Sequence, residues 1–309
     1  MIRSMYSGIS GLKNFQTKLD VIGNNIANVN TYGFKKGRTV FKDLISQTTS
    51  GASGASATRG GVNPKQVGLG SQLSAIDTIH SGGSLQTTGR TLDIGISGDG
   101  FFVVGDSANT PVPGGAVVAL DNLQYTRAGN FYMDAKGYLV NGDGKYVYGF
   151  TENARDLAGA ASAPAPAAPG YVIPAGGGAP AGNNVGPIRI PTDAQSMSIS
   201  QDGMVTYVDA NSNLQYAGKL VTAKFANTGG LQKTGNNYYS TTSNSGTPYY
   251  SFGTENGTGS LESGFLEMSN VDLSEEFTDM IVAQRGFQAN TRIITTSDSI
   301  LEELINLKR

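Results

Sequence analysis

The residue types that enzymes use most often for catalysis are scarce in this chain. It has 309 residues, no cysteine and a single histidine, His80. A zinc site of the usual cysteine and histidine type therefore lacks its ligands, and a catalytic triad or dyad would have to use His80. We interpret His80, between Ile79 and Ser81, as a surface or half-buried strand residue. The sequence predicts that the chain is not an enzyme.

The glycine-rich segments do not match known ligand-binding loops. The chain contains no GxxxxGK[ST] or GxSxG pattern, and no GxGxxG that follows a strand and opens a helix. Residues 141–145 (NGDGK) resemble a fragment of a calcium loop but lack the distal glutamate, so we interpret them as a hairpin turn. We therefore expect no cofactor, no metal and no small-molecule substrate.

Charge gives no sign of a nucleic-acid partner. The formal net charge is −2, whereas a nucleic-acid binder needs an excess of lysine and arginine. Lys35, Lys36 and Arg38 form a small basic cluster, which we interpret as a solvated face or a contact between subunits. The sequence also has no run of 18 apolar residues and no apolar stretch typical of a cleaved signal peptide in its first thirty residues.

The elements that could organise the chain begin with a repeat at each end. Apolar residues recur every seven positions, which is typical of helices that pair along a seam. At the amino end the two stripes are Met5, Leu12, Leu19 and Ile26, and Phe15, Ile22 and Val29. At the carboxyl end the stripe is Leu273, Met280, Phe287, Ile294 and Leu301, flanked by Phe277, Leu304 and Ile305. We expect Ser274 to cap the second helix.

Between the ends, short apolar runs alternate with glycine turns. Strands are predicted at 94–97 and 101–104 around a tight turn, then at 123–127, 130–133, 138–140 and 146–150. A weaker series follows at 197–199, 204–208 and 220–225. The predicted fold class is therefore α+β, with coiled-coil-like pairing of the terminal helices and a mainly antiparallel β domain between them.

Composition divides the chain further. Residues 158–187 hold ten alanines, seven glycines and six prolines among thirty residues, so we interpret them as a surface insertion or loop. A second small-residue stretch at 46–58 is interpreted in the same way. We expect a terminal helical domain (1–30 and 272–309), a linker region (31–90), and a β domain (91–157 and 188–271).

An asparagine-rich corner follows the first helix at residues 24–36 (NNIANVNTYGFKK). Asparagine tolerates left-handed backbone and bonds to its own main chain, so several of them beside Gly33 predict a defined helix-to-loop corner. A corner specified in this way is typical of an assembly joint.

These segments resemble the bacterial flagellar rod and hook proteins. The resemblance rests on residues 7–12 (SGISGL), 19–31 (LDVIGNNIANVNT) and 33–35 (GFK), and on 269–277 (SNVDLSEEF) and 284–290 (QRGFQAN). Internal matches are 92–102 (LDIGISGDGFF) and 125–131 (YTRAGNF). Within the family, 63–70 (NPKQVGLG) and 89–93 (GRTLD) look hook-like, so we expect a short hook protein without a large outer domain, with a distal-rod protein as the alternative.

The resemblance implies a subunit that polymerises helically into a tubular, flexible joint transmitting motor torque. Its partners would be copies of itself, the distal rod below, hook–filament junction proteins above, and the hook cap and flagellar export machinery during assembly. It implies export without a cleaved signal and an extracellular place in the flagellum. The residues expected at subunit contacts are Met5, Leu12, Phe15, Leu19, Ile22, Ile26, Asn24, Asn25, Asn28, Asn30, Phe34, Leu273, Phe277, Met280, Phe287, Ile294, Leu301 and Ile305.

Two other classes of protein remain as alternatives. A secreted hydrolase would depend on His80 or on a carboxylate pair. A carbohydrate- or host-binding module would show ligand-induced stabilisation of the β domain. The length of the matching segments favours the axial subunit.

Overall fold

The computed structural model describes residues 2–55, 58–106, 123–150 and 185–307. The chain divides into two compact units built from separated segments. Unit 1 comprises Met1–Val29, Lys36–Ile79 and Val271–Arg309, and unit 2 comprises Asn30–Lys35 and His80–Asn270. The expected linker region, 31–90, is therefore shared between the units. The expected insertion, 158–187, lies outside the described residues except for its last three.

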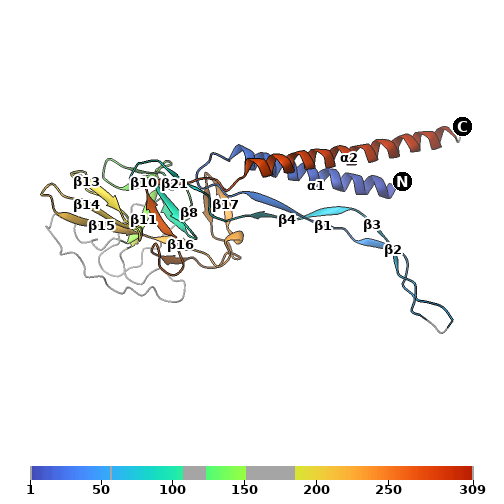
Figure 1. Ribbon diagram of the computed structural model, residues 1–309, viewed down its shortest axis with the longest axis horizontal. Helices are drawn as coiled ribbons and strands as arrows, with labels where there is room; N and C mark the ends of the chain where they lie inside the picture. Colours follow the sequence, from blue (N-terminus) through green and yellow to red (C-terminus); the bar gives the residue numbers. More distant parts are fainter. Residues whose placement is uncertain (1, 56–57, 107–122, 151–184, 308–309) are drawn as a thin grey trace. The chain divides into compact units, whose positions relative to one another are not determined.

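Unit 1 holds two long helices and two strand pairs. The helices are α1 (Ile2–Ala27) and α2 (Leu273–Asn306), and they lie side by side in Figure 1. Strand β1 (Gly37–Asp43) pairs with β4 (Ser71–Thr78), and β2 (Ser46–Ser50) pairs with β3 (Lys65–Gly68), both antiparallel. Every residue of β2 and β3 is exposed, so the small-residue stretch from Ser46 forms an open two-stranded ribbon.

Unit 2 is built from antiparallel strands, as predicted. Its thirteen-stranded sheet follows the order β13-β14-β15-β11-β7-β8-β18-β17, and β9, β10, β12, β16 and β19 pair beside this path. Two further pairs, β20–β6 and β21–β5, complete the described part of the unit. The bounds are β5 Leu85–Thr87, β6 Ile94–Ser97, β7 Phe101–Gly105, β8 Gln124–Thr126, β9 Phe131–Met133, β10 Leu139–Asn141, β11 Tyr146–Phe150, β12 Val185–Pro187, β13 Ser196–Ile199, β14 Met204–Val208, β15 Leu214–Leu220, β16 Thr222–Lys224, η2 (a 3₁₀ turn) Thr228–Gly230, β17 Gln232–Gly235, β18 Tyr238–Ser240, β19 Tyr249–Ser251, β20 Ser260–Ser263 and β21 Phe265–Glu267.

The strand β7 is buried on both faces, which explains its continuous apolar run. Phe102 and Val104 belong to one buried cluster, and Phe101 and Val103 belong to a second. Because side chains alternate along a strand, each pair faces a different core. This strand therefore forms part of the wall between the two cores of unit 2.

The predicted hairpin at residues 94–104 is not formed. The first run, β6, pairs with β20, whereas β7 pairs with β8, β11 and β16. The linking residues Gly98 and Gly100 have φ angles of 122° and 136°. Glycine adopts such angles readily, whereas residues with a Cβ atom rarely do. These two glycines let the chain pass from one pairing to the other instead of reversing into a hairpin.

The turn at residues 141–145 does join two paired strands, β10 and β11. The Oδ1 atom of Asn141 accepts hydrogen bonds from the amides of Asp143 and Lys145, at 3.0 and 2.9 Å. The side chain of Asn141 thus closes this turn. None of the helices that the structure describes is long and apolar enough to cross a membrane.

Candidate functional site: the helix pair and the corner

The two helices of unit 1 run antiparallel, and small residues bring them close together. A Cβ added at Gly8 would lie 3.4 Å from Ile294, and one at Gly11 would lie 2.9 Å from the Asn290 side chain. A Cβ at Gly286 would meet the Phe15 ring at 2.5 Å. Gly8 and Gly11, which weaken α1 as an isolated helix, therefore make room for α2, and Gly286 of α2 makes room for Phe15 of α1.

The face of α2 that packs against α1 contains only some of the predicted seam residues. Met280, Ile294 and Leu301 are half-buried, as are Met5, Leu12, Phe15, Leu19 and Ile26 of α1, while Ile22 is buried. The companion stripe on α2 consists of small or polar residues seven positions apart, namely Glu276, Ala283, Asn290 and Ser297. A search for apolar periodicity misses this stripe because three of its four members are polar.

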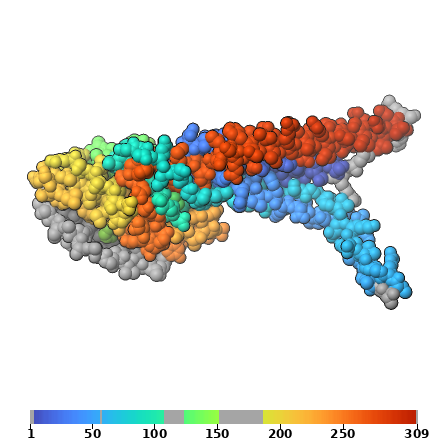
Figure 2. Space-filling view, viewed as in Figure 1, coloured from blue at the N-terminus to red at the C-terminus, as the bar shows by residue number. Residues whose placement is uncertain are grey.

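Several predicted seam residues of α2 are exposed instead. The exposed fractions are 39% for Leu273, 50% for Phe277, 36% for Phe287 and 67% for Ile305. Ile293, Ile300 and Leu307, spaced by seven residues, are 45%, 42% and 82% exposed. Figure 2 shows α2 as the outer edge of the helix pair on the face in view. The helix thus carries apolar side chains outside its contact with α1, and their assignment to subunit contacts stays a prediction.

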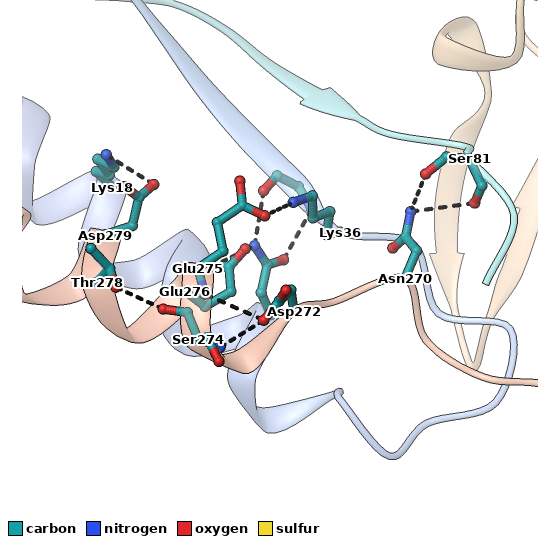
Figure 3. A network of polar contacts seen from close by, with 12 residues as sticks. Lys18, Lys36, Ser81, Asn270, Asp272, Ser274, Glu275, Glu276, Thr278 and Asp279 are labelled. Atoms are coloured by element: carbon teal, nitrogen blue, oxygen red, sulfur yellow. Dashed lines mark hydrogen bonds and ion pairs between the residues drawn. The ribbon is translucent and has the colours of Figure 1, made fainter. Parts of the chain in front are cut away.

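Polar contacts hold the start of α2 in place, as Figure 3 shows. The helix is capped by Asp272 and not by Ser274, because the Asp272 side chain accepts from the amides of Ser274 and Glu275 at 2.8 and 3.4 Å. Asp272 precedes the first helical residue, which is where a side-chain oxygen can reach the free amides. Lys36 Nζ lies 2.6 Å from Glu275 Oε2, and Lys18 Nζ lies 3.2 Å from Asp279 Oδ2.

Asn25 is the residue that joins α1, β1 and α2. Its Nδ2 donates to the Gly37 carbonyl at 2.9 Å and to Glu276 Oε2 at 3.1 Å, and its Oδ1 accepts from the Gly37 amide. Asn25 and Glu276 are both buried, and burial raises the pKa of the Glu276 carboxyl. The side chain of Asn25 thus bonds to both β1 and α2 from its place in α1.

The rest of the corner behaves differently from Asn25. Asn28 Nδ2 donates to the Asn24 carbonyl at 2.9 Å and closes the end of α1, whereas Asn24 and Asn30 are exposed. None of these asparagines adopts positive φ; the left-handed residue is Gly33, with φ of 70°. The corner is therefore defined, but its reversal depends on glycine.

The predicted basic cluster is split, and Lys35 is the residue for which the solvated-face interpretation is wrong. Lys35 and Glu267 have fully buried side chains, with Lys35 Nζ 2.6 Å from Glu267 Oε1. Arg127 Nη1 lies 3.1 Å from Glu267 Oε2 and is also buried. We call Lys35, Arg127 and Glu267 the ionic cluster. Arg38 remains on the surface, near Asp77.

His80 lies beside this cluster, after the end of β4 and outside any strand. Its ring is 5.7 Å from that of Phe101 and 5.5 Å from that of Tyr239. Burial, and then the positive charges of Arg127, Lys35 and Lys233, lower the pKa of His80 to about 4. The imidazole is thus neutral at neutral pH. In the part of the chain that the structure describes, no three histidine or carboxylate residues are grouped to hold a metal ion.

Three protein-family models match successive parts of the chain. "Flagella basal body rod protein" matches residues 5–35, "Flagellar hook protein FlgE/F/G D1 domain" matches 95–207, and "Flagellar basal body rod FlgEFG protein C-terminal" matches 262–307. The first match contains most of α1 and the corner, and the third contains all of α2. The chain is therefore a structural protein of the bacterial flagellum, and not an enzyme.

Full-length relatives agree with these matches. The flagellar basal-body rod protein FlgG of Bacillus subtilis (strain 168) is 53% identical over 310 positions, covering 100% of both chains. The flagellar hook protein FlgE of Borreliella burgdorferi is 33% identical over 456 positions, again covering 100% of both. The chain belongs to the family of bacterial flagellar rod and hook proteins, whose members self-polymerise within the axial structure of the flagellum.

A solved structure, that of the flagellar hook protein FlgE2 of Helicobacter pylori, is 26% identical and covers 38% of this chain and 24% of that chain. Its TM-score of 0.22 is too low for a comparison of folds.

Proposed function

We propose that this chain is the distal-rod subunit of the flagellar basal body rather than a hook subunit. The observation that carries the proposal is the length of the alignments. The rod protein of Bacillus subtilis aligns over 310 positions with a chain of 309 residues. The hook protein of Borreliella burgdorferi aligns over 456 positions, so at least 147 of them (456 less 309) face a gap in this chain. We therefore propose the distal-rod protein, which the sequence indicated as the alternative, in place of the expected hook protein.

In this proposal the helix pair is the element that builds the polymer. Met280, Ile294 and Leu301 are half-buried and spaced by multiples of seven residues, which supports a coiled-coil-like seam. The small and polar residues of the companion stripe let the two helices approach closely. Gly286 of α2 acts in the same way, because it lies against the Phe15 ring of α1. Such a pair gains part of its stability from copies packed around it, because exposed apolar area remains on α2.

The exposed apolar residues of α2 are the proposed contacts between copies. Ile293, Ile300 and Leu307 lie on one face, because seven residues are close to two turns of helix. Leu273, Phe277 and Ile281, four residues apart, lie on another. Contiguous exposed apolar patches mark association surfaces in soluble proteins. A second copy of this chain is the proposed occupant, since members of the family self-polymerise.

The remaining parts of the proposal concern place and partners. The chain would be exported through the flagellar export machinery without a cleaved signal, and would act outside the inner membrane. Its copies would contact one another and other axial subunits at either end of the rod. The absence of cysteine from the sequence is compatible with this route, because no disulfide has to form after export.

Complementation separates the rod from the hook. We would express this chain in Bacillus subtilis strains lacking either the rod protein FlgG or the hook protein, and image isolated basal bodies by electron microscopy. The proposal expects straight rods in the first strain and no hooks in the second, with the bacterium's own FlgG as the positive control. Curved tubes in the strain that lacks its hook protein would overturn the proposal.

A further inference from the structure

Three segments that are distant in the sequence meet at the ionic cluster of unit 2. Segment 30–35 supplies Lys35, segment 80–84 supplies the Ser81 carbonyl, which accepts from Lys35 Nζ at 2.8 Å, and segment 267–270 supplies Glu267. The Gly83 amide donates to Glu267 Oε1 at 2.9 Å, and the Gly33 amide donates to the Glu267 carbonyl at 2.8 Å. Glu267 therefore connects all three segments through its side chain and main chain.

The cluster buries two cations against one carboxylate. Arg127, 2% exposed, contacts the second oxygen of Glu267. Burial lowers the pKa of Lys35 while the Glu267 carboxylate opposes that effect. With two cations on one carboxylate, the buried group already carries an excess positive charge and depends on added hydrogen bonds, such as that from Lys35 to the Ser81 carbonyl. One more positive charge beside it would be unfavourable.

His80 is the residue that can add that charge. Its ring packs on Phe101 and Tyr239, and Tyr239 itself is buried. Neither ring nitrogen has a hydrogen-bond partner within the described residues, although the backbone of Thr228 is near enough to raise its pKa slightly. The charged groups facing His80 are Arg127, Lys35 and Lys233, all positive. Within this environment, Glu267 is the carboxylate of the cluster and is already shared by two cations.

We propose that the ionic cluster and His80 form an acid-released lock, in which a neutral His80 holds segment 30–35 in unit 2 and a protonated His80 releases it. The lock is a property of a single copy of the chain. It therefore does not depend on whether the polymer is rod or hook.

The direction of the pH effect follows from proton linkage. His80 has a pKa of about 4 in the closed lock, against an ordinary value of 6.5 once the ring reaches water. The open state therefore binds more protons between these values, and opening becomes more favourable as the pH falls through that window. The opening equilibrium should rise by roughly 80-fold between pH 6.5 and pH 4, out of a limiting rise of roughly 300-fold, at tenfold per unit of pKa difference. At about pH 4 the closed state is itself half protonated, so the contribution of His80 is complete only about one pH unit below that value.

The test uses the full chain in its monomeric form. Because His80 is the single histidine of the sequence, its ring resonances report its protonation by NMR without assignment of any other imidazole. Amide hydrogen exchange at Gly33 and Gly83, corrected for the intrinsic effect of pH, reports opening of the lock. We expect the ring to titrate near pH 4 and protection of both amides to fall as the pH is lowered towards that value.

Variants separate His80 from the carboxylate. His80→Phe keeps an aromatic ring against Phe101 and Tyr239 but cannot be protonated, so the pH dependence of opening should flatten. Lys233→Met removes one facing cation and should raise the pKa of His80 and shrink the pH dependence, whereas the exposed control Lys136→Met should change neither. If His80→Phe opens with the wild-type pH profile, another group carries the pH dependence and the assignment to His80 is wrong. A wild-type imidazole that titrates near 6.5 would also overturn the proposal, even if the variant fails to fold.

Discussion

At the scale of single residues, Glu267 connects parts of the chain that are distant in the sequence. Its side chain contacts Lys35 and Arg127, and both of its carboxylate oxygens are used. The local sequence gives no sign of this role. Glu267 is the last residue of a three-residue strand, β21. Its role arises from partners that lie 232 and 140 residues away.

Removing the charge of Glu267 should strongly destabilise unit 2. Glu267→Gln leaves Lys35 and Arg127 as buried cations without a counter-charge, which costs about 3–5 kcal/mol of unfolding free energy. The matched control is Glu262→Gln. The Glu262 carboxylate is more exposed and accepts a hydrogen bond from Gln201 at 3.2 Å, which the amide oxygen of glutamine can also accept. Urea denaturation at neutral pH should show a loss in the first variant and a change within about 0.5 kcal/mol in the second. Equal stabilities would show that the buried charges do not require one another.

At the scale of elements, α2 has two uses for its apolar residues. Ala283, Met280 and Ile294 are turned towards the helix pair, whereas Ile293 and Ile300 are exposed. An apolar repeat in one sequence cannot tell these faces apart, because both obey helical spacing. The small and polar residues of the companion stripe distinguish the packed face from the exposed one. Their role is evident only when α1 is seen packed against them.

The closeness of the helices predicts different outcomes for the same substitution at two glycines. Gly286→Leu would drive atoms into the Phe15 ring, where even a Cβ comes within 2.5 Å, and should destabilise the helix pair by about 1–3 kcal/mol. Gly23→Leu in α1 has nothing within 4 Å and should stabilise the helix by up to about 0.8 kcal/mol. Thermal unfolding followed by circular dichroism at 222 nm measures both. Loss of stability in the Gly23 variant, or none in the Gly286 variant, would contradict the close packing described.

The exposed face of α2 makes a separate prediction about assembly. Ile300→Asp places a charge on the proposed contact between copies, which is unfavourable when that contact is buried. We expect the monomer to keep its stability while the critical concentration for polymerisation rises at least tenfold in sedimentation assays. Ser299→Asp, one position away and already exposed and polar, should polymerise as the wild type does. If both variants assemble normally, this face is not a contact between copies.

At the scale of the whole molecule, each unit is made of segments that are separated in the sequence. The two ends of the chain and residues 36–79 form unit 1, while residues 30–35 join unit 2. Among the described residues, the two buried apolar clusters of unit 2 draw their members from the range Leu92 to Leu261. Neither cluster takes a residue from a terminal helix.

Truncation should separate folding from assembly. A chain that ends at Asn270 lacks α2, so α1 loses its partner, and isolated helices with several glycines are marginal in water. We expect loss of helical signal and of polymers, together with a cooperative melting transition that unit 2 retains. A truncated chain that still polymerises would exclude α2 as the assembly element. Loss of all cooperative melting would show that unit 2 depends on unit 1.

The sequence by itself determined the local features of this protein. Heptad spacing located both helices, alternating apolar runs and glycines located strands such as β7, β11 and β14, and long motifs indicated the flagellar family. These features depend on residues within a few positions of one another, so their signal is present in the sequence alone.

Only the tertiary structure decided which residues meet. It paired β6 with β20 instead of β7, buried Lys35 against Glu267, and showed which side of α2 is used within the chain. The physical reason is that burial and ion pairing depend on partners more than a hundred residues away. A lysine has the same local signature whether it faces water or a buried carboxylate.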